Sequence, residues 1–173
     1  MRDQRSTASN STINFFSRFQ GTEQFEKIFK EGMGLVEETA NYLDGQGRAD
    51  SRALDRPATI AYATESMRLT TRLMQLASWL LLQRAIGAGE VTEQDAARDK
   101  GRVSLSDIGA GNDIPGAENL PEGLLDLVAR SLRLHERIIV IDNMANKKVE
   151  IAAANENPVA MQMDQLTRAF GNR

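Results

Sequence analysis

The single histidine, His135, is the first residue to consider for chemistry, because imidazole is the side chain that most readily exchanges a proton near neutral pH. It falls on the apolar side of a helical pattern, with Ser131 four residues before it and Asp142 seven after it. One interpretation is a general base or a pH-sensitive contact. The other is a core or interface histidine that bonds Ser131 or a backbone carbonyl. We favour the second, because no nucleophile or oxyanion stabiliser accompanies His135.

Sites for phosphate, metal or cofactor are not indicated. The stretch from Gly109 to Ile114 lacks the preceding strand and the third glycine of a dinucleotide-binding turn, so we interpret it as a loop. The chain has one histidine and no cysteine, and its acidic residues do not follow EF-hand spacing. We therefore expect no catalytic residue, no cofactor and no metal. A small helical enzyme using His135, Glu136 and Arg137 remains the competing class.

The charge balance argues against nucleic acid as a partner. Lys and Arg number 21 against 24 Asp and Glu, which gives a net charge of −3. A small nucleic-acid-binding or transcription regulator remains an alternative, but the arginines lie scattered among acids without interleaved aromatic residues. The apolar runs are too short for a membrane span, and the first residues lack the apolar core of a secretory signal. We expect a soluble, cytoplasmic protein without membrane insertion.

Three helical patterns account for most of the chain. They cover about residues 22–43, 57–86 and 120–143, with a long connection over 87–119. We predict an all-α fold, an antiparallel three-helix bundle within residues 21–145. A disordered N-terminal arm (1–20) and a flexible C-terminal tail (146–173) flank it. The residues from Asp44 to Asp50 are predicted to form a turn-rich link.

Local signals mark the ends and contacts of these helices. Thr22 offers an N-cap for the first helix, and Pro57 suits the first position of the second. Asn119 is predicted to open the third helix by the same capping logic. Gly32 lies in the middle of the apolar face of the first helix. It weakens the helix by about 1 kcal/mol, but it allows another helix to approach closely.

The second helix is apolar around much of its circumference. We assign its core face to Ile60, Ala63, Met67, Leu69, Leu73, Met74, Leu76, Leu80 and Leu81. The other side begins polar with Glu65, Arg68 and Arg72, at spacings that suit ion pairs on a solvated surface. It then turns apolar at Trp79, Leu82 and Ile86.

The apolar end of this second side has two interpretations. In the first interpretation, these residues are buried under the N-terminal arm or under a short helix near residues 92–100. A dimer or partner interface made by Trp79, Leu82, Ile86, Arg68 and Arg72 is the other, since an exposed tryptophan patch usually marks an interface. The pattern does not choose between them.

The C-terminal tail contains a weak amphipathic pattern. Its members are Met161, Met163, Leu166 and Phe170, and Pro158 interrupts any helix before them. We interpret this part of the tail as a short recognition segment.

The second helix also carries a resemblance to a known family. The stretches Gly47-Arg48 and Ser51-Arg52-Ala-Leu54, followed by Ala61-Tyr-Ala-Thr-Glu-Ser-Met-Arg-Leu-Thr-Thr-Arg-Leu-Met-Gln-Leu-Ala-Ser-Trp-Leu-Leu-Leu-Gln-Arg84, resemble the regulator of CtrA degradation (RcdA) family of alphaproteobacteria. The likeness is dense over residues 45–90 and loose elsewhere.

This resemblance implies a dimeric three-helix bundle with a flexible C-terminal tail and no enzymatic activity. It implies a proteolytic adaptor in cell-cycle regulation, which helps deliver the response regulator CtrA and other substrates to the protease ClpXP. The implied partners are a second copy of the chain as a homodimer, ClpXP, and the accessory adaptors CpdR and PopA. Recruitment to a cell pole is also implied. The resemblance transfers no site residues to this sequence.

Overall fold

The structure, a computed structural model, describes residues 22–91, 95, 105 and 114–155, with side chains described up to Met144. The chain divides into two compact units. One unit is Ser17–Ile139, which we call the bundle unit. The other combines Met1–Phe16 with Val140–Arg173. The packing and contacts described below belong to the bundle unit.

The first long helix, α2, runs from Glu23 to Asp44 and begins as predicted. The backbone N–H of Phe25 donates to the Thr22 hydroxyl at 3.4 Å, which confirms Thr22 as the N-cap. The link after α2 is different from our prediction. Instead of turns alone it contains a short helix, α3 (Gln46–Arg52), and Arg48 Nη2 pairs with the Asp44 carboxylate at 2.9 Å across this junction.

The second long helix, α4, runs from Arg56 to Gly87. Its N-cap is Asp55, whose carboxylate accepts from the N–H of Ala58 at 2.9 Å, so Pro57 is the second helical residue rather than the first. Asn119 does not open the third helix. It ends a 3-10 turn, η1 (Ala117–Asn119), and the helix α6 starts at Glu122 after Pro121.

The helix α6 continues to Asn155, well past the end that we predicted near 143. The weakening of its apolar pattern after Met144 was therefore misinterpreted as the start of the tail. A helix can continue where its apolar face ends, because propensity and backbone hydrogen bonds do not require a core contact. The predicted arm (1–20) lies outside the described residues, as does the tail beyond Asn155.

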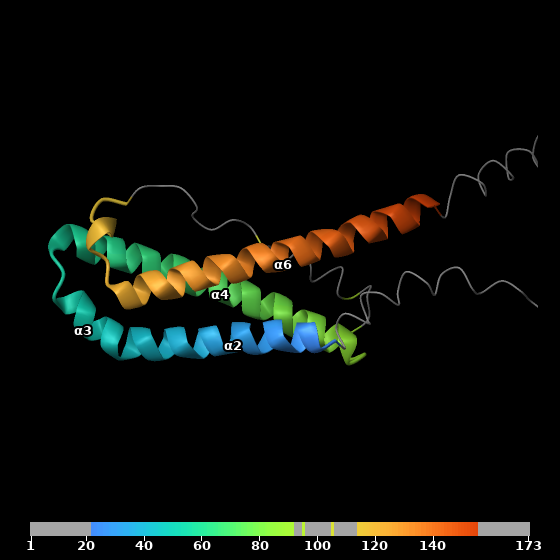
Figure 1. Cartoon of the computed structure of the whole chain (residues 1–173), viewed down its shortest axis with the longest axis horizontal. Coiled ribbons are helices and arrows are strands. Elements are labelled where there is room, and N and C mark those ends of the chain that lie inside the picture. The colour runs from blue at the N-terminus through green and yellow to red at the C-terminus, as the bar shows by residue number, and fades with distance from the viewer. Residues whose placement is uncertain (1–21, 92–94, 96–104, 106–113, 156–173) are drawn as a thin grey trace, which may run out of the picture. The chain divides into compact units, whose positions relative to one another are not determined.

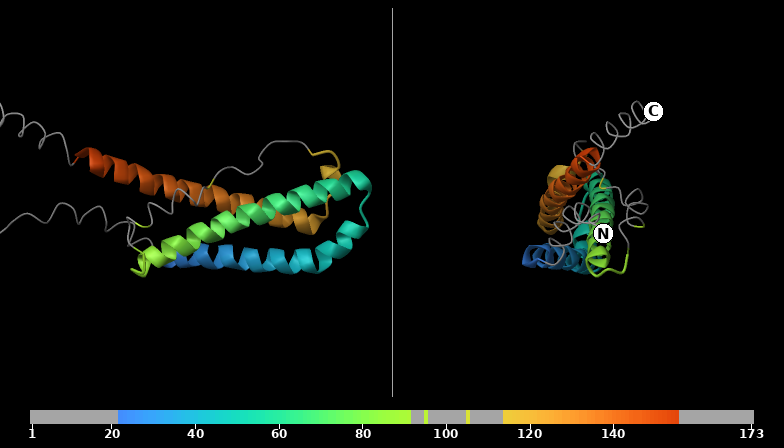
Figure 2. Two further views of the ribbon diagram at one scale, coloured as in Figure 1. Left: turned by 180° about the vertical axis from the view of Figure 1, so that it is seen from behind. Right: turned by 90° about the vertical axis from the view of Figure 1, so that its right-hand side faces the viewer.

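The described elements are all helices, which confirms the all-α prediction, and α2, α4 and the first part of α6 lie side by side (Figures 1 and 2). The helix α2 is antiparallel to both of the others. The helices α4 and α6 run parallel, however, because α6 begins at the end of the bundle where α4 begins. Gly116, near the end of the connection between α4 and α6, packs directly against Pro57 and Ala58. The fold is therefore a three-helix bundle with one parallel helix pair.

The core of the bundle unit is built from leucines and a few larger side chains of all three long helices. Its fully buried members include Phe25, Leu69, Leu76, Trp79, Leu80, Leu124, Leu134 and Ile138. The close approach predicted for Gly32 is present. A Cβ at this position would lie 2.5 Å from Cδ1 of Leu80 and 3.6 Å from Cδ2 of Leu134, so α2, α4 and α6 meet at this glycine.

The predicted core face of α4 is confirmed at Leu69, Leu73, Leu76 and Leu80, which are buried, and is wrong elsewhere. Trp79 and Arg72, assigned to the second side of the helix, are buried at 2% exposure each, whereas Ile60, Met67, Met74 and Leu81 face away from the core. The prediction failed because apolar residues surround this helix. Hydrophobic periodicity then cannot identify the face that packs. The fit of α4 to the neighbouring helices determines which of its residues enter the core.

Candidate functional site

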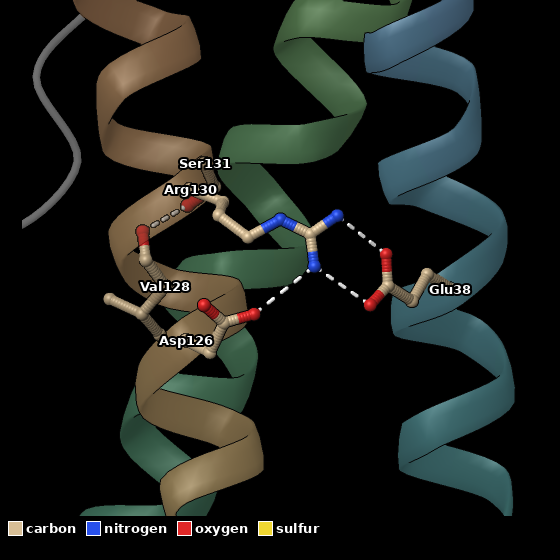
Figure 3. Close-up of polar contacts among 5 residues, drawn as sticks. All are labelled: Glu38, Asp126, Val128, Arg130 and Ser131. Atoms are coloured by element: carbon tan, nitrogen blue, oxygen red, sulfur yellow. Dashed lines mark hydrogen bonds and ion pairs between the residues drawn. The ribbon is translucent and has the colours of Figure 1, made fainter.

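A buried polar contact joins the parallel helices. Arg72 Nη1 on α4 donates to Ser131 Oγ on α6 at 2.9 Å. Ser131 in turn donates to the carbonyl of Val128 at 2.7 Å, as Figure 3 shows. His135, one turn after Ser131, is also buried at 4% exposure. The general-base interpretation of His135 requires access for a substrate, and its burial therefore favours the core interpretation.

Ion pairs link α2 to α6 on the surface. Arg130 makes two hydrogen bonds to the carboxylate of Glu38, at 2.6 and 2.7 Å, and a third to Asp126 on its own helix at 3.1 Å (Figure 3). The bond from Arg130 lowers the pKa of Glu38, and the same bond raises the pKa of Arg130. Seven residues further along α6 and seven residues earlier in α2, Arg137 Nη1 donates to both carboxylate oxygens of Glu31 at 2.8 Å. These pairs align the two antiparallel helices.

A second polar contact ties α2 to α3. The Tyr42 hydroxyl donates to the Asp50 carboxylate at 3.0 Å, and burial together with this bond raises the pKa of Tyr42 well above its ordinary value of 10.0. Glycines make room for the ring, since a Cβ at Gly47 or Gly123 would lie within 2.8 Å of it. This end of the bundle is a packed structural junction.

The solvent-facing side of α4 differs from an ordinary helix surface because it lacks exposed charged residues between Pro57 and Gln83. The three charged residues between Pro57 and Gln83 are Glu65, Arg68 and Arg72, and none of them is exposed. All exposed residues of this stretch are uncharged, and we call them together the outer face of α4. They are Pro57, Thr59, Ile60, Ala63, Met67, Thr70, Thr71, Met74, Ser78 and Leu81. By contrast, the exposed side of α2 carries charged residues such as Lys27, Lys30 and Glu37, as an ordinary solvated helix does.

The large residues of the outer face have considerable accessible surface. Ile60, Met67, Met74 and Leu81 are 60%, 69%, 65% and 51% exposed, and they recur every seven residues. Sequence reasoning missed this surface because it placed all four in the core. The signal that could have revealed it is the seven-residue spacing, with only small or hydroxyl-bearing residues on either side.

The hydroxyl groups of the outer face are already satisfied by their own helix. Each donates to the carbonyl four residues earlier: Thr59 to Asp55 at 2.7 Å, Thr70 to Ser66 at 2.8 Å, Thr71 to Met67 at 2.8 Å and Ser78 to Met74 at 2.8 Å. A hydroxyl bonded in this way does not require water or another partner for its proton. The face therefore behaves as less polar than its composition indicates.

The residues predicted to form an interface are not all at the surface. Trp79 and Arg72 are buried within the single chain, while Leu82 and Ile86 are half-buried. Arg68 is also half-buried and pairs with Glu65 at 2.8 Å. A Trp79→Asp change would therefore disturb the core first. The assignment of this patch to a dimer or partner stays a prediction, and it can involve only Leu82, Ile86 and Arg68 without rearrangement of the core.

The remaining predicted site residues cannot be placed. Met161, Met163, Leu166 and Phe170 of the recognition segment lie outside the described residues.

Within the part of the chain that the structure describes, no three acidic or histidine side chains gather as a metal site. None of the described helices is long and apolar enough to cross a membrane.

Comparison with known proteins relates the chain to a family and to a solved structure. A family model described as a protein of unknown function (DUF1465) matches residues 16–170. The crystal structure of RcdA from Caulobacter crescentus CB15 is similar at 49% sequence identity and a TM-score of 0.59, over 72% of this chain and 92% of that one. No curated protein matches the sequence.

Proposed function

Since the chain belongs to the DUF1465 family and is similar to RcdA of Caulobacter, we propose that it is an RcdA-like regulator that acts as a non-catalytic adaptor. The single observation that carries this proposal is the 49% identity to RcdA over 92% of that protein's chain. Identity of this degree over nearly the whole of RcdA supports a shared role as well as a shared fold.

The structure supports a binding role over an enzymatic one. His135, on which the enzyme alternative depends, lies at 4% exposure in the core of the bundle unit. A proton donor or acceptor must come within hydrogen-bond reach of its substrate, and a buried helix position does not allow this. The bundle instead offers long helix surfaces, which suit contacts with other proteins.

The proposed activity is delivery of the response regulator CtrA and other substrates to the protease ClpXP. In this proposal the chain works with the accessory adaptors CpdR and PopA, forms a homodimer and is recruited to a cell pole. Leu82, Ile86 and Arg68 are candidates for one contact surface, and the segment with Met161, Met163, Leu166 and Phe170 for another. Nucleic acid is not part of the proposed mechanism.

The test of this role is a binding experiment with purified components. ClpX is immobilised in the presence of CpdR, and retention of CtrA is measured with and without the full-length chain. We expect CtrA to be retained only when the chain is present. Retention of CtrA without the chain, or failure to retain CtrA when the chain is present, would contradict the adaptor role. Tight binding of DNA that weakens steeply with salt would favour a nucleic-acid-binding regulator instead.

A further inference from the structure

We propose that the outer face of α4 binds an amphipathic helix of a different protein, with acidic residues near both ends of that helix. The proposal deepens the adaptor function by naming the kind of substrate segment that the chain recognises, and it rests on that function for its biological purpose. Its physical basis is separate, because it comes from the exposure, spacing and charge of the described residues of α4.

The first observation is the exposure of apolar side chains in the middle of the face. Met67 and Met74 are exposed at 69% and 65%, and no exposed charge lies between Pro57 and Gln83. A soluble helix normally covers its solvent side with charged residues. A continuous apolar strip on the surface usually marks a site of association.

The second observation is that the hydroxyl groups of the face can lose water at little cost. A buried hydroxyl without a hydrogen-bond partner destabilises a complex by about 1–3 kcal/mol. On this face Thr70, Thr71 and Ser78 already donate to carbonyls of α4 at 2.8 Å. These donors remain satisfied when a bound protein excludes water, so binding buries apolar area with little polar penalty.

The third observation is the spacing, which suits a helix as the bound element. The large residues of the face are separated by seven residues each along about 30 Å of helix: Ile60, Met67, Met74 and Leu81. A seven-residue repeat keeps contact with a second helix when the two wind around each other. The small residues Ala63, Thr70 and Ala77 follow the first three at a spacing of three, and they leave holes for the side chains of the bound helix.

The fourth observation is an exposed arginine at each end of the strip. Arg56 precedes Ile60 by four residues and Arg84 follows Leu81 by three, so each lies one helical turn beyond the apolar residues and on the same side of the helix. The guanidinium of Arg84 lies 4.7 Å from the ring centroid of Phe29, which positions it at the edge of the face. The strip is therefore uncharged along its length and basic at both ends.

These two arginines determine which occupant fits. A carboxylate matches the planar guanidinium through two parallel hydrogen bonds, so an acid near each end of the bound helix complements the face. A second copy does not. In a parallel pair Arg56 would meet the partner's Arg56, and in an antiparallel pair centred on Thr70 it would meet the partner's Arg84. Like charges would then oppose each other at both ends and weaken the pairing.

The same features define the segment that binds. Arg56 and Arg84 are 28 positions apart, or about 42 Å of helix, so a segment that reaches both is a helix of about eight turns. Methionine side chains adapt to different apolar surfaces, and Met67 and Met74 therefore suit more than one sequence with this pattern. Such tolerance agrees with an adaptor that receives several substrates.

The test measures binding of a synthetic helix to the full-length chain by fluorescence anisotropy. The labelled probe has four heptads with leucine at the apolar positions and glutamate in its first and last turns, and it is used at a concentration where it is monomeric. We expect saturable binding. A probe with lysine in place of the terminal glutamates should bind at least about tenfold more weakly. In the double variant Arg56→Glu, Arg84→Glu the preference between the two probes should reverse.

Two single variants provide the matched comparison. Met74→Glu should weaken binding of the glutamate probe at least about tenfold, because a charge enters an apolar contact. Leu125→Glu changes an apolar residue of α6 that is 45% exposed, and it should bind the probe as wild type does. Since Met74 is 65% exposed, circular dichroism should show unchanged helix content in its variant.

Several results would overturn the proposal. They are absence of saturable binding, equal binding of the two probes by wild type, and wild-type binding by Met74→Glu. Sedimentation that shows Met74→Glu converting a dimer into a monomer would assign the face to a second copy and would also overturn it. Retention of CtrA on ClpX by a chain that binds no probe would refute this inference alone. Probe binding as expected, without retention of CtrA, would refute the proposed function alone.

Discussion

Arg72 of α4 and Ser131 of α6 form a hydrogen bond of 2.9 Å in the interior of the bundle, between side chains that are 2% and 0% exposed. Burial of a guanidinium destabilises a fold unless its donors find acceptors, and this bond gives the Nη1 group an acceptor on the parallel helix. The contact joins residues 59 positions apart in the sequence. It is a structural device of the fold, and not a surface for partners.

Replacement of Arg72 tests this interpretation. Arg72→Ala removes the charged hydrogen bond and leaves a cavity, and should lower the free energy of unfolding by about 2–4 kcal/mol. Arg72→Met keeps much of the side-chain volume and should destabilise the protein less. The measurement is urea unfolding followed by circular dichroism. The exposed Arg133→Met is the control, with an expected change within about 0.5 kcal/mol. Equal effects of all three changes would show that the buried bond has no special role.

Two glycines of α2 provide a matched pair. Gly34→Ala should stabilise the protein by about 0.5–1 kcal/mol, since a Cβ there would contact nothing within 4 Å and alanine favours helix. Gly32→Ala should destabilise it by about 1–2 kcal/mol, because its Cβ would lie 2.5 Å from Leu80 in a filled core. Thermal or urea unfolding measures both. If the two substitutions had the same sign, the close approach of the three helices at Gly32 would be wrong.

The ion pair of Glu38 and Arg130 predicts a pH dependence at acid pH. The folded protein lowers the pKa of Glu38 below its ordinary value of 4.5, so the pair stabilises the fold above that pH. This stabilisation is lost as the pH falls through the lowered pKa. The side chains are 50% and 37% exposed, so the pair contributes at most about 1 kcal/mol.

A double-mutant cycle measures this contribution. The single changes Glu38→Gln and Arg130→Met, and their combination, are compared by urea unfolding. We expect a coupling energy of about 0.5–1 kcal/mol at neutral pH, which disappears well below pH 4.5. A coupling energy that stayed constant with pH would mean that the pair is held together by packing and not by charge.

Removal of residues 158–173 tests the recognition segment. The described part of α6 ends at Asn155, so this deletion leaves the described helices intact and should not change the melting temperature. It should weaken retention of some substrates on ClpX. A large fall in melting temperature would instead make these residues part of the fold.

The sequence predicts those features of the fold that depend on local chemistry. The Thr22 cap and the close approach at Gly32 follow from residues within one helix, and both are present. The direction of α6 relative to α4 does not follow, because a connection as long as 88–121 can return to either end of a helix. The end of α6 was predicted too early because the apolar pattern of the sequence weakens after Met144, whereas the helix continues to Asn155.

The candidate surface was missed for a reason that α4 makes clear. Met67 and Leu69 are both apolar, yet one is 69% exposed and the other is fully buried. Only the positions of α2 and α6 determine which of them enters the core. Likewise, arginine usually lies at the surface of a protein, but Arg72 is buried because it bonds Ser131 of another helix. The sequence around one residue of such a pair does not identify its partner on another helix.

The most direct test of the adaptor account is the rate at which ClpXP degrades CtrA in a purified system that contains CpdR and PopA. Addition of the full-length chain should accelerate the loss of CtrA, and the acceleration should saturate as the concentration of the chain rises. The chain itself should be unable to modify or cleave CtrA when the protease is absent. A rate of CtrA loss that is the same with and without the chain would contradict the account.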